Sequence, residues 1–109
     1  MPCGKCPWLM VGGLALLALL SRPGLLAAQQ VDPERGRALA REVCANCHVV
    51  EAGGRGTDAV PSFQSIVARP GVTDAQLRGF IADPHPRMPD LQLTNSQIED
   101  IVSYLDSLR

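Results

Sequence analysis

The amino-acid sequence predicts an all-α domain of three to four helices, and three observations support this prediction. Two capping-box patterns, Thr73–Gln76 and Thr94–Gln97, each precede a segment whose apolar residues recur at steps of three and four. Residues 33–44 show similar spacing behind an Asp-Pro start. No segment alternates apolar and polar residues as a half-buried strand does. We therefore expect helices joined by long connections rich in Gly and Pro.

The first helix is expected at residues 33–44. Asp32 is a candidate N-cap, and Pro33 suits the first helical position because its backbone has no N–H to satisfy. Residues 52–60 are rich in Gly and predict a flexible loop. A short helix is expected after Pro61, and the Arg-Pro-Gly sequence that follows it should end it.

The third and fourth helices are expected behind the two capping boxes. The third has apolar residues at Leu77, Phe80 and Ile81, and the prolines at 84 and 86 should end it. The fourth has a strongly amphipathic pattern. Its apolar positions are Ile98, Ile101, Val102, Leu105 and Leu108.

Residues 1–28 have the layout of a secretory signal peptide. A basic residue precedes an apolar run of thirteen residues, and small residues end the segment at Ala28. The alternative is an uncleaved membrane anchor, but the run is shorter than the ~20 residues that a spanning helix needs. We expect cleavage near Ala28 and export to an oxidising compartment, which is the periplasm if the source is bacterial.

Residues 29–109 form one small, acidic domain. They contain eight Arg against eleven acidic residues, a net charge of −3, and no Lys. Because no basic stripe is present, we expect no nucleic-acid partner. An apolar core of this size supplies on its own only ~3–5 kcal/mol of net stability. A disulfide, a metal or a cofactor is therefore expected to complete the core.

The chemistry lies in residues 44–48, which read Cys-Ala-Asn-Cys-His. Two thiols at this spacing can add to the vinyl groups of a haem, and the following His can bind its iron. A thioredoxin-like redox pair, a Cys44–Cys47 disulfide and a zinc site with His48 and His85 are the alternatives. We predict that Cys44 and Cys47 attach one haem c covalently and that His48 is the proximal iron ligand.

Met88 is the predicted distal iron ligand and the only Met in residues 29–109. It lies in a Pro-flanked turn between the last two expected helices, where packing offers little reason for an apolar side chain. A thioether ligand favours ferrous iron and raises the reduction potential. His85 is the rival ligand and would give a lower potential, although the prolines on both sides of it restrict its reach.

In these residues the chain resembles the small class I cytochromes c in their bacterial single-haem form. Gly36, eight residues before the first Cys of the motif, matches a Gly that lets the first and last helices of that family cross closely. Pro61 resembles the Pro whose carbonyl accepts a hydrogen bond from the proximal His. Met88-Pro89 matches the distal ligand and the Pro after it, and Tyr104-Leu105 matches a C-terminal aromatic pair.

The resemblance implies a cytochrome c domain over residues 29–109, with three to four helices wrapped around one covalently attached haem. It implies a periplasmic one-electron carrier that has no substrate of its own and is not an enzyme. Its partners would be redox proteins: a membrane cytochrome complex, a terminal oxidase or a periplasmic dehydrogenase. The alternatives are an electron-transfer subunit of a periplasmic dehydrogenase and a haem enzyme or ligand sensor with an open distal site. A small positive rim for docking is expected at Arg41, Arg55, Arg69 and Arg87.

Overall fold

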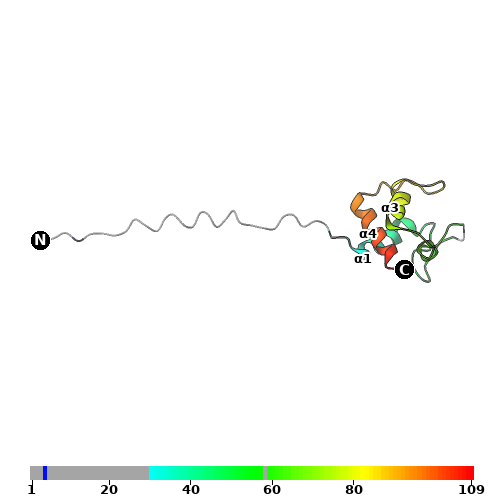
Figure 1. Cartoon of the computed structure of the whole chain (residues 1–109), viewed down its shortest axis with the longest axis horizontal. Helices are drawn as coiled ribbons and strands as arrows, with labels where there is room; N and C mark the ends of the chain where they lie inside the picture. Colours follow the sequence, from blue (N-terminus) through cyan, green and yellow to red (C-terminus); the bar gives the residue numbers. More distant parts are fainter. Residues whose placement is uncertain (1–3, 5–29, 58) are drawn as a thin grey trace.

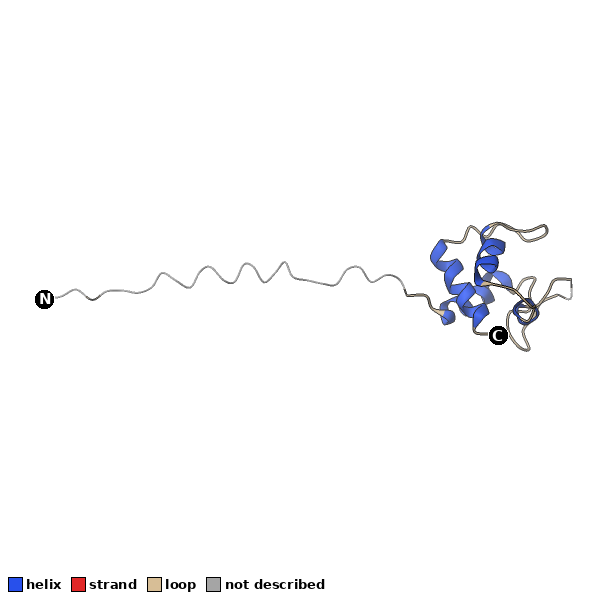
Figure 2. Cartoon of the chain, in the orientation of Figure 1, coloured by secondary structure: helices blue, strands red, loops and turns tan. Residues whose placement is uncertain are grey.

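A computed structural model describes Gly4 and residues 30–57 and 59–109 of the chain (Figure 1). Apart from Gly4, the predicted signal peptide at residues 1–28 lies outside the described residues. The part that is described contains helices and loops and no strand, which confirms the all-α prediction (Figure 2). None of the helices in this part is both long and apolar enough to span a membrane. In chain order the elements are α1 (Pro33–Leu39), η1 (Ala40–Cys44), α2 (Phe63–Val67), α3 (Asp74–Ala82) and α4 (Asn95–Asp106).

The predicted first helix is present but changes its winding at Ala40. The Asp32 side chain caps α1 by accepting hydrogen bonds from two backbone N–H groups of the first turn, at 2.9 and 3.3 Å. From Ala40 to Cys44 the chain forms a π-helical turn, η1. The N–H of Ala45 accordingly donates to the Ala40 carbonyl, five residues back, at 3.0 Å. Such turns occur often at functional sites, and this one immediately precedes the C-x-x-C-H motif.

The crossing of α1 and α4 is centred on Gly36, as predicted. A Cβ atom at Gly36 would lie 1.9 Å from the Asp100 carbonyl oxygen and 2.9 Å from the Ile101 nitrogen. No real Cβ approaches a backbone so closely, so only Gly allows these two helices to touch. One turn further on, Ala40 is 0% exposed. The crossing is therefore closed by backbone and by the smallest side chains.

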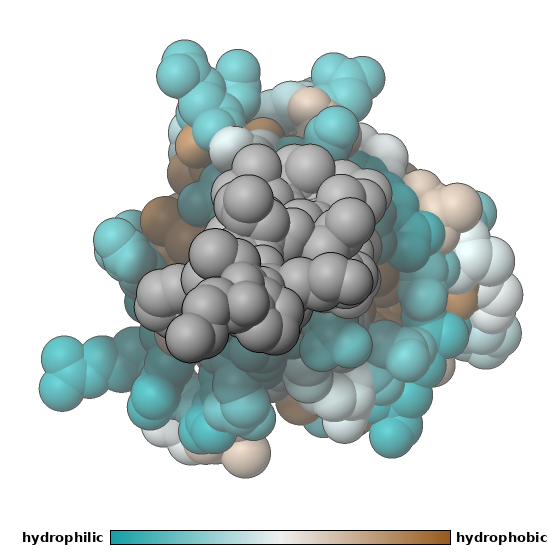
Figure 3. Space-filling model, turned by 90° about the vertical axis from the view of Figure 1, so that its left-hand side faces the viewer, coloured by the Kyte–Doolittle hydropathy of each residue, from teal (hydrophilic) through white to brown (hydrophobic). Residues whose placement is uncertain are grey.

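The last helix, α4, is the element on which the others pack. It contacts α1, α2 and α3, and Figure 1 shows α1 and α3 beside it. Its predicted capping box is formed: the Gln97 side chain accepts from the Thr94 N–H at 2.8 Å, and Thr94 Oγ1 accepts from the Gln97 N–H at 3.3 Å. On the face shown in Figure 3, hydrophilic residues cover most of the described surface. The buried apolar core consists of Ala40, Cys44, Val50, Phe63, Val67, Leu77, Ile98, Ile101, Val102, Tyr104 and Leu105.

The helices α2 and α3 begin where the sequence predicts, with one difference in packing. Ser62 Oγ caps α2 by accepting from the Ser65 N–H at 3.1 Å, and Thr73 forms the predicted capping box of α3. In α3, Leu77 is buried but Phe80 is 59% exposed. Of the apolar positions expected in this helix, Phe80 therefore does not pack in the core. Its ring lies at the rim of a cavity instead.

Candidate functional site

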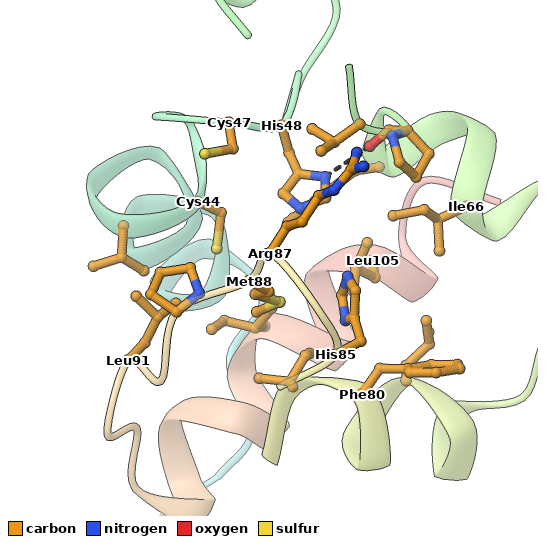
Figure 4. Close-up of a pocket in the computed structure, with 18 of the residues that line it drawn as sticks. Cys44, Cys47, His48, Ile66, Phe80, His85, Arg87, Met88, Leu91 and Leu105 are labelled. Carbon is orange, nitrogen blue, oxygen red and sulfur yellow. Dashed lines mark hydrogen bonds between the residues drawn. The ribbon is translucent and has the colours of Figure 1, made fainter. Parts of the chain in front are cut away.

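The predicted site residues line one cavity of about 660 Å³ (Figure 4). Cys44, Cys47 and His48 reach it from η1 and the turn that follows, and Met88 reaches it from the connection between α3 and α4. Most of the remaining wall is apolar. It is formed by Val43, Ala59, Val60, Phe63, Ile66, Val72, Leu77, Phe80, Ile81, Pro86, Pro89, Leu91, Leu93, Ile101 and Leu105.

The two cysteines at the cavity are free thiols in different environments. Cys44 ends η1 and is buried, whereas Cys47 lies in the turn after it and is exposed. Burial raises the pKa of the Cys44 thiol to about 11, because the surroundings disfavour the charged thiolate. No disulfide joins the two residues, so both sulfur atoms are available for thioether bonds.

The imidazole of His48 is held by a backbone carbonyl. Its Nδ1 atom lies 2.7 Å from the Pro61 oxygen, as the dashed line in Figure 4 marks. A carbonyl oxygen can only accept, so Nδ1 carries the hydrogen and the neutral ring keeps its lone pair on Nε2. The ring also packs against Phe63, with their centroids 5.7 Å apart. His48 is thus held in a tautomer that suits metal binding through Nε2.

The loop that follows the C-x-x-C-H motif folds back and contacts the backbone of the motif. The Thr57 N–H donates to the Cys47 carbonyl at 3.1 Å. A Cβ atom at Gly56 would lie 2.5 Å from the Val49 nitrogen and 2.7 Å from the His48 carbonyl carbon. The sequence predicts only a flexible loop here. It does not show that Gly56 lets this loop lie against the backbone of His48 and Val49. The density of Gly in this loop is a signal, but it does not say which Gly makes the contact.

Met88 is presented by a tight turn. Its N–H donates to the His85 carbonyl at 3.0 Å, which places Pro86 and Arg87 at the two central positions. Arg87 has a φ of 80°, as at the third position of a type II turn, where Gly is usual. His85 lines the same cavity, with its ring centroid 6.0 Å from that of Phe80. The structure therefore brings both candidate distal ligands, Met88 and His85, to the cavity.

The structure also bears on the alternative zinc site and on the expected positive rim. Within the described residues, no group of three or more His, Cys, Asp or Glu side chains is placed to hold a metal ion, so the alternative zinc site lacks its ligand set. The four arginines of the expected positive rim lie in different places, and the exposed Arg55 does not line the cavity. Arg41 is engaged by Glu51, with Nε 2.7 Å from Oε1, whereas Arg69 and Arg87 line the cavity.

The residues present fit a covalently attached haem. The cavity offers two free thiols, an imidazole whose lone pair is kept on Nε2 and a thioether, all within an otherwise apolar wall. These are the groups that attach and ligate haem in c-type proteins. The volume of about 660 Å³ also lies in the usual range for cofactor sites, ~300–1,000 Å³.

A helical fold with a C-x-x-C-H motif and a Met-bearing turn on one apolar cavity defines a c-type cytochrome. Residues 31–105 match the family described as cytochrome c oxidase, cbb3-type, subunit III, and the chain belongs to this family. It is also 41% identical over 97 residues to cytochrome c-552 of Bradyrhizobium diazoefficiens, which covers 88% of this chain and 90% of that protein. No solved structure matches the chain significantly.

The protein is a monohaem cytochrome that carries electrons, with covalently bound haem c as its cofactor. The predicted cytochrome c fold, cofactor and electron-carrying function are thereby confirmed. Proteins of this kind typically transfer electrons and are not enzymes, and they exchange those electrons with other proteins.

Proposed function

We propose that the protein is a periplasmic one-electron carrier whose haem is attached by Cys44 and Cys47 and ligated by His48 and Met88. The observation that supports this assignment is that all four side chains line the same cavity. The hydrogen bond from His48 Nδ1 to the Pro61 carbonyl, at 2.7 Å, supports the role of His48 as the proximal ligand.

Each of these residues has its own task. The sulfur atoms of Cys44 and Cys47 form the thioether bonds, and His48 binds iron through Nε2. The Pro61 carbonyl holds the proton of His48 on Nδ1 and makes the ring a better donor. The Met88 sulfur would be the second protein ligand of the iron. When bound, haem supplies one reversible electron between ferrous and ferric iron, at a potential that the thioether ligand raises.

The same arrangement argues for a carrier without enzymatic activity. With both His48 and Met88 bound to the iron, the protein would leave no open position at which a substrate could bind. With haem bound, the mostly apolar wall would leave few polar groups to rearrange when the charge of the iron changes. His85 is the candidate acid or base on the Met88 turn that lines the cavity, and Pro84 and Pro86 flank it.

Residues 1–28 support export to the periplasm, because their layout is that of a cleaved signal peptide. The partners we propose are a membrane cytochrome complex, a terminal oxidase or a periplasmic dehydrogenase. The description of the matched family, a cytochrome c oxidase subunit, favours a terminal oxidase among these. Purification from its own host under mild conditions tests this proposal. A protein that elutes alone is a free carrier, whereas stable co-elution with a dehydrogenase makes it a subunit.

Optical spectra of the purified ferric and ferrous protein test the ligand set. We expect a sulfur-to-iron band at the red end of the ferric spectrum and one unsplit α band in the ferrous spectrum. Haem should also stay with the protein through acid-acetone extraction, because two thioether bonds hold it. Freely extractable haem would contradict attachment by Cys44 and Cys47. A low-spin ferric spectrum without the sulfur band would mean that His85, and not Met88, is the distal ligand.

A further inference from the structure

Arg87 is a cation at the cavity that has no carboxylate partner within the described residues. In the same part of the chain, five other Arg side chains form ion pairs with Asp or Glu. They are Arg35, Arg37, Arg41, Arg78 and Arg109. Arg87 forms no such pair there and lines the cavity beside the Met88 turn (Figure 4). Its guanidinium is therefore available to an anion that the protein itself does not supply.

The backbone conformation at position 87 does not favour Arg, so folding alone does not explain why Arg occupies it. Its φ of 80° lies in the left-handed region, which a residue with a Cβ atom adopts reluctantly and Gly adopts freely. The bond from the Met88 N–H to the His85 carbonyl, at 3.0 Å, locks the turn around it. Gly would fit this turn with less strain. The presence of Arg therefore indicates that the Arg87 side chain has a function.

The electrostatics of the cavity indicate which anion Arg87 would meet. The charged or titratable side chains on the wall, besides the two cysteines, are His48, His85, Arg69 and Arg87, and no Asp or Glu lines it. Asp83 lines only a neighbouring hollow beside Phe80. A haem brings two propionate carboxylates into this apolar and cationic space. Arg87 is an exposed residue of this wall, and Arg can bind a carboxylate through two parallel hydrogen bonds.

We propose that Arg87 binds a haem propionate and thereby ties the seating of the cofactor to the presentation of Met88, the next residue. This inference rests on the proposed function, because it requires haem in the cavity with Met88 on its distal side. The pairing keeps the propionate ionised. The positive charge of Arg87 also favours ferrous over ferric iron, since the ferric site carries one more positive charge.

Three variants of the haem-loaded protein separate charge from backbone. Arg87→Gln removes the charge and keeps the Cβ atom, Arg87→Gly removes the charge and relaxes the backbone, and Arg87→Lys keeps the charge. Arg55→Gln is the matched control, because Arg55 is exposed and does not line the cavity. The reduction potential of each protein is measured by redox titration from acidic to alkaline pH, and the ferric spectrum is recorded on the same samples.

We expect the potential to fall in both Arg87→Gln and Arg87→Gly and to gain a new dependence on pH. The unpaired propionate should bind protons about tenfold or more tightly, because an opposite charge at contact shifts a carboxyl by at least that factor. Arg87→Lys should retain most of the original potential, and Arg55→Gln should match the unmodified protein. Because removal of the Arg87 charge also acts on His85 in the same turn, Arg87→Gln is repeated together with His85→Ala, and the new pH dependence should persist in that protein.

Two results would overturn the inference. One is a potential that changes no more in Arg87→Gln than in Arg55→Gln across the pH range. The other is an Arg87→Gly protein that behaves like the unmodified one, since the charge would then be removed without effect. The ferric sulfur band keeps this failure distinct from failure of the proposed function. Its absence from the unmodified protein overturns ligation by Met88, whereas its presence with an unresponsive potential overturns only the role of Arg87.

Discussion

The crossing of α1 with α4 and the turn that presents Met88 differ in how the chain holds them. At the crossing, Gly36 touches the backbone of α4, and Ile101 and Val102 are 1% and 2% exposed. At the turn, one backbone hydrogen bond of 3.0 Å joins Met88 to His85, and Arg87 has a left-handed φ of 80°. The Met88 side chain contributes to a cavity wall and not to the packed core.

This difference indicates which part of the domain depends on the cofactor for its stability. The α1–α4 side is closed by protein contacts, so its stability depends on helix packing. The opposite side surrounds about 660 Å³ of space with apolar side chains. Those side chains gain little from folding until something fills the space. We therefore expect perturbations on the packed side to change mainly stability, and perturbations at the Met88 turn to change mainly the binding of the iron.

Loss of haem should have the largest effect. In the double variant Cys44→Ser and Cys47→Ser, we expect a largely unfolded chain, because conformational entropy of ~1.5 kcal/mol per ordered residue must be offset by burial. Circular dichroism should show low helix content and no cooperative thermal transition. Any remaining protection in hydrogen exchange should lie in α1 and α4. A cooperative transition with near-native helix content would show that the domain folds without haem.

Gly36→Val should be the most damaging single substitution on the packed side. Its Cβ atom would lie 1.9 Å from the Asp100 carbonyl oxygen, so the helices must separate. We expect a loss of about 3 kcal/mol of unfolding free energy, the upper range for overpacking. Gly79→Ala is the control, since a Cβ at Gly79 meets nothing within 4 Å. In the middle of α3 it should stabilise by about 0.5–1 kcal/mol. Equal urea midpoints for Gly36→Val and the unmodified protein would mean that the helices do not touch there.

Met88→Ala should have a smaller effect on stability and a large one on ligation. We expect a loss of about 2 kcal/mol, the low end for Met→Ala, because the residue is only half-buried. The ferrous protein should then bind carbon monoxide, the potential should fall and weak peroxidase activity should appear, since a coordination position is open. His85→Ala should leave a low-spin, sulfur-ligated spectrum. Spectra and carbon monoxide titrations of both variants decide the ligand. If His85→Ala opened the site and Met88→Ala did not, the distal ligand would be His85.

Much of the fold is predictable from the sequence because its signals are local. The capping residues Asp32, Thr73 and Thr94 act on backbone groups two or three positions away, so each helix start can be read without the rest of the structure. The π turn at η1 and the outward position of Phe80 are different. Both depend on how finished helices meet and on the cavity, and neither leaves a local pattern.

The candidate site divides in the same way. The residues Cys44, Cys47 and His48 form one contiguous motif, so their chemistry is evident from spacing alone. Met88 is distant in sequence and is predicted as the single Met of residues 29–109 in a Pro-flanked turn, whereas Pro61 is placed by resemblance to a family. The close approach at Gly56 and the left-handed φ of Arg87 could not be predicted, although Arg87 is expected in the positive rim, because both depend on how the loops are folded. Such features depend on tertiary structure, which a single sequence does not encode in any short pattern.

The smallest effect we expect is on the packed side, at the carboxylate of Asp100. It accepts hydrogen bonds from the Asp32 N–H at 2.8 Å and from Arg35 Nε at 2.9 Å, which join the start of α1 to α4. The Arg35 hydrogen bond, helped by the Asp32 N–H, lowers the pKa of Asp100 below its ordinary value of 3.8. Asp100→Asn should therefore cost about 1 kcal/mol at neutral pH, near the lower range for hydrogen bonds to a charged group because Arg35 is largely solvated.

The sign of the pH dependence follows from the lowered pKa of Asp100. The folded state holds the carboxylate ionised, so its contribution to stability is present above pH 3.8, the ordinary pKa, and is lost as the pH falls through the lower folded-state value. Urea unfolding at neutral pH should thus separate Asp100→Asn from the unmodified protein, and the gap should close in acid. Asp106→Asn is the control, since Asp106 is exposed and meets Arg109 only one turn away at 3.0 Å. A gap that stayed constant from neutral pH into acid would show that Asp100 acts through its shape and not through its charge.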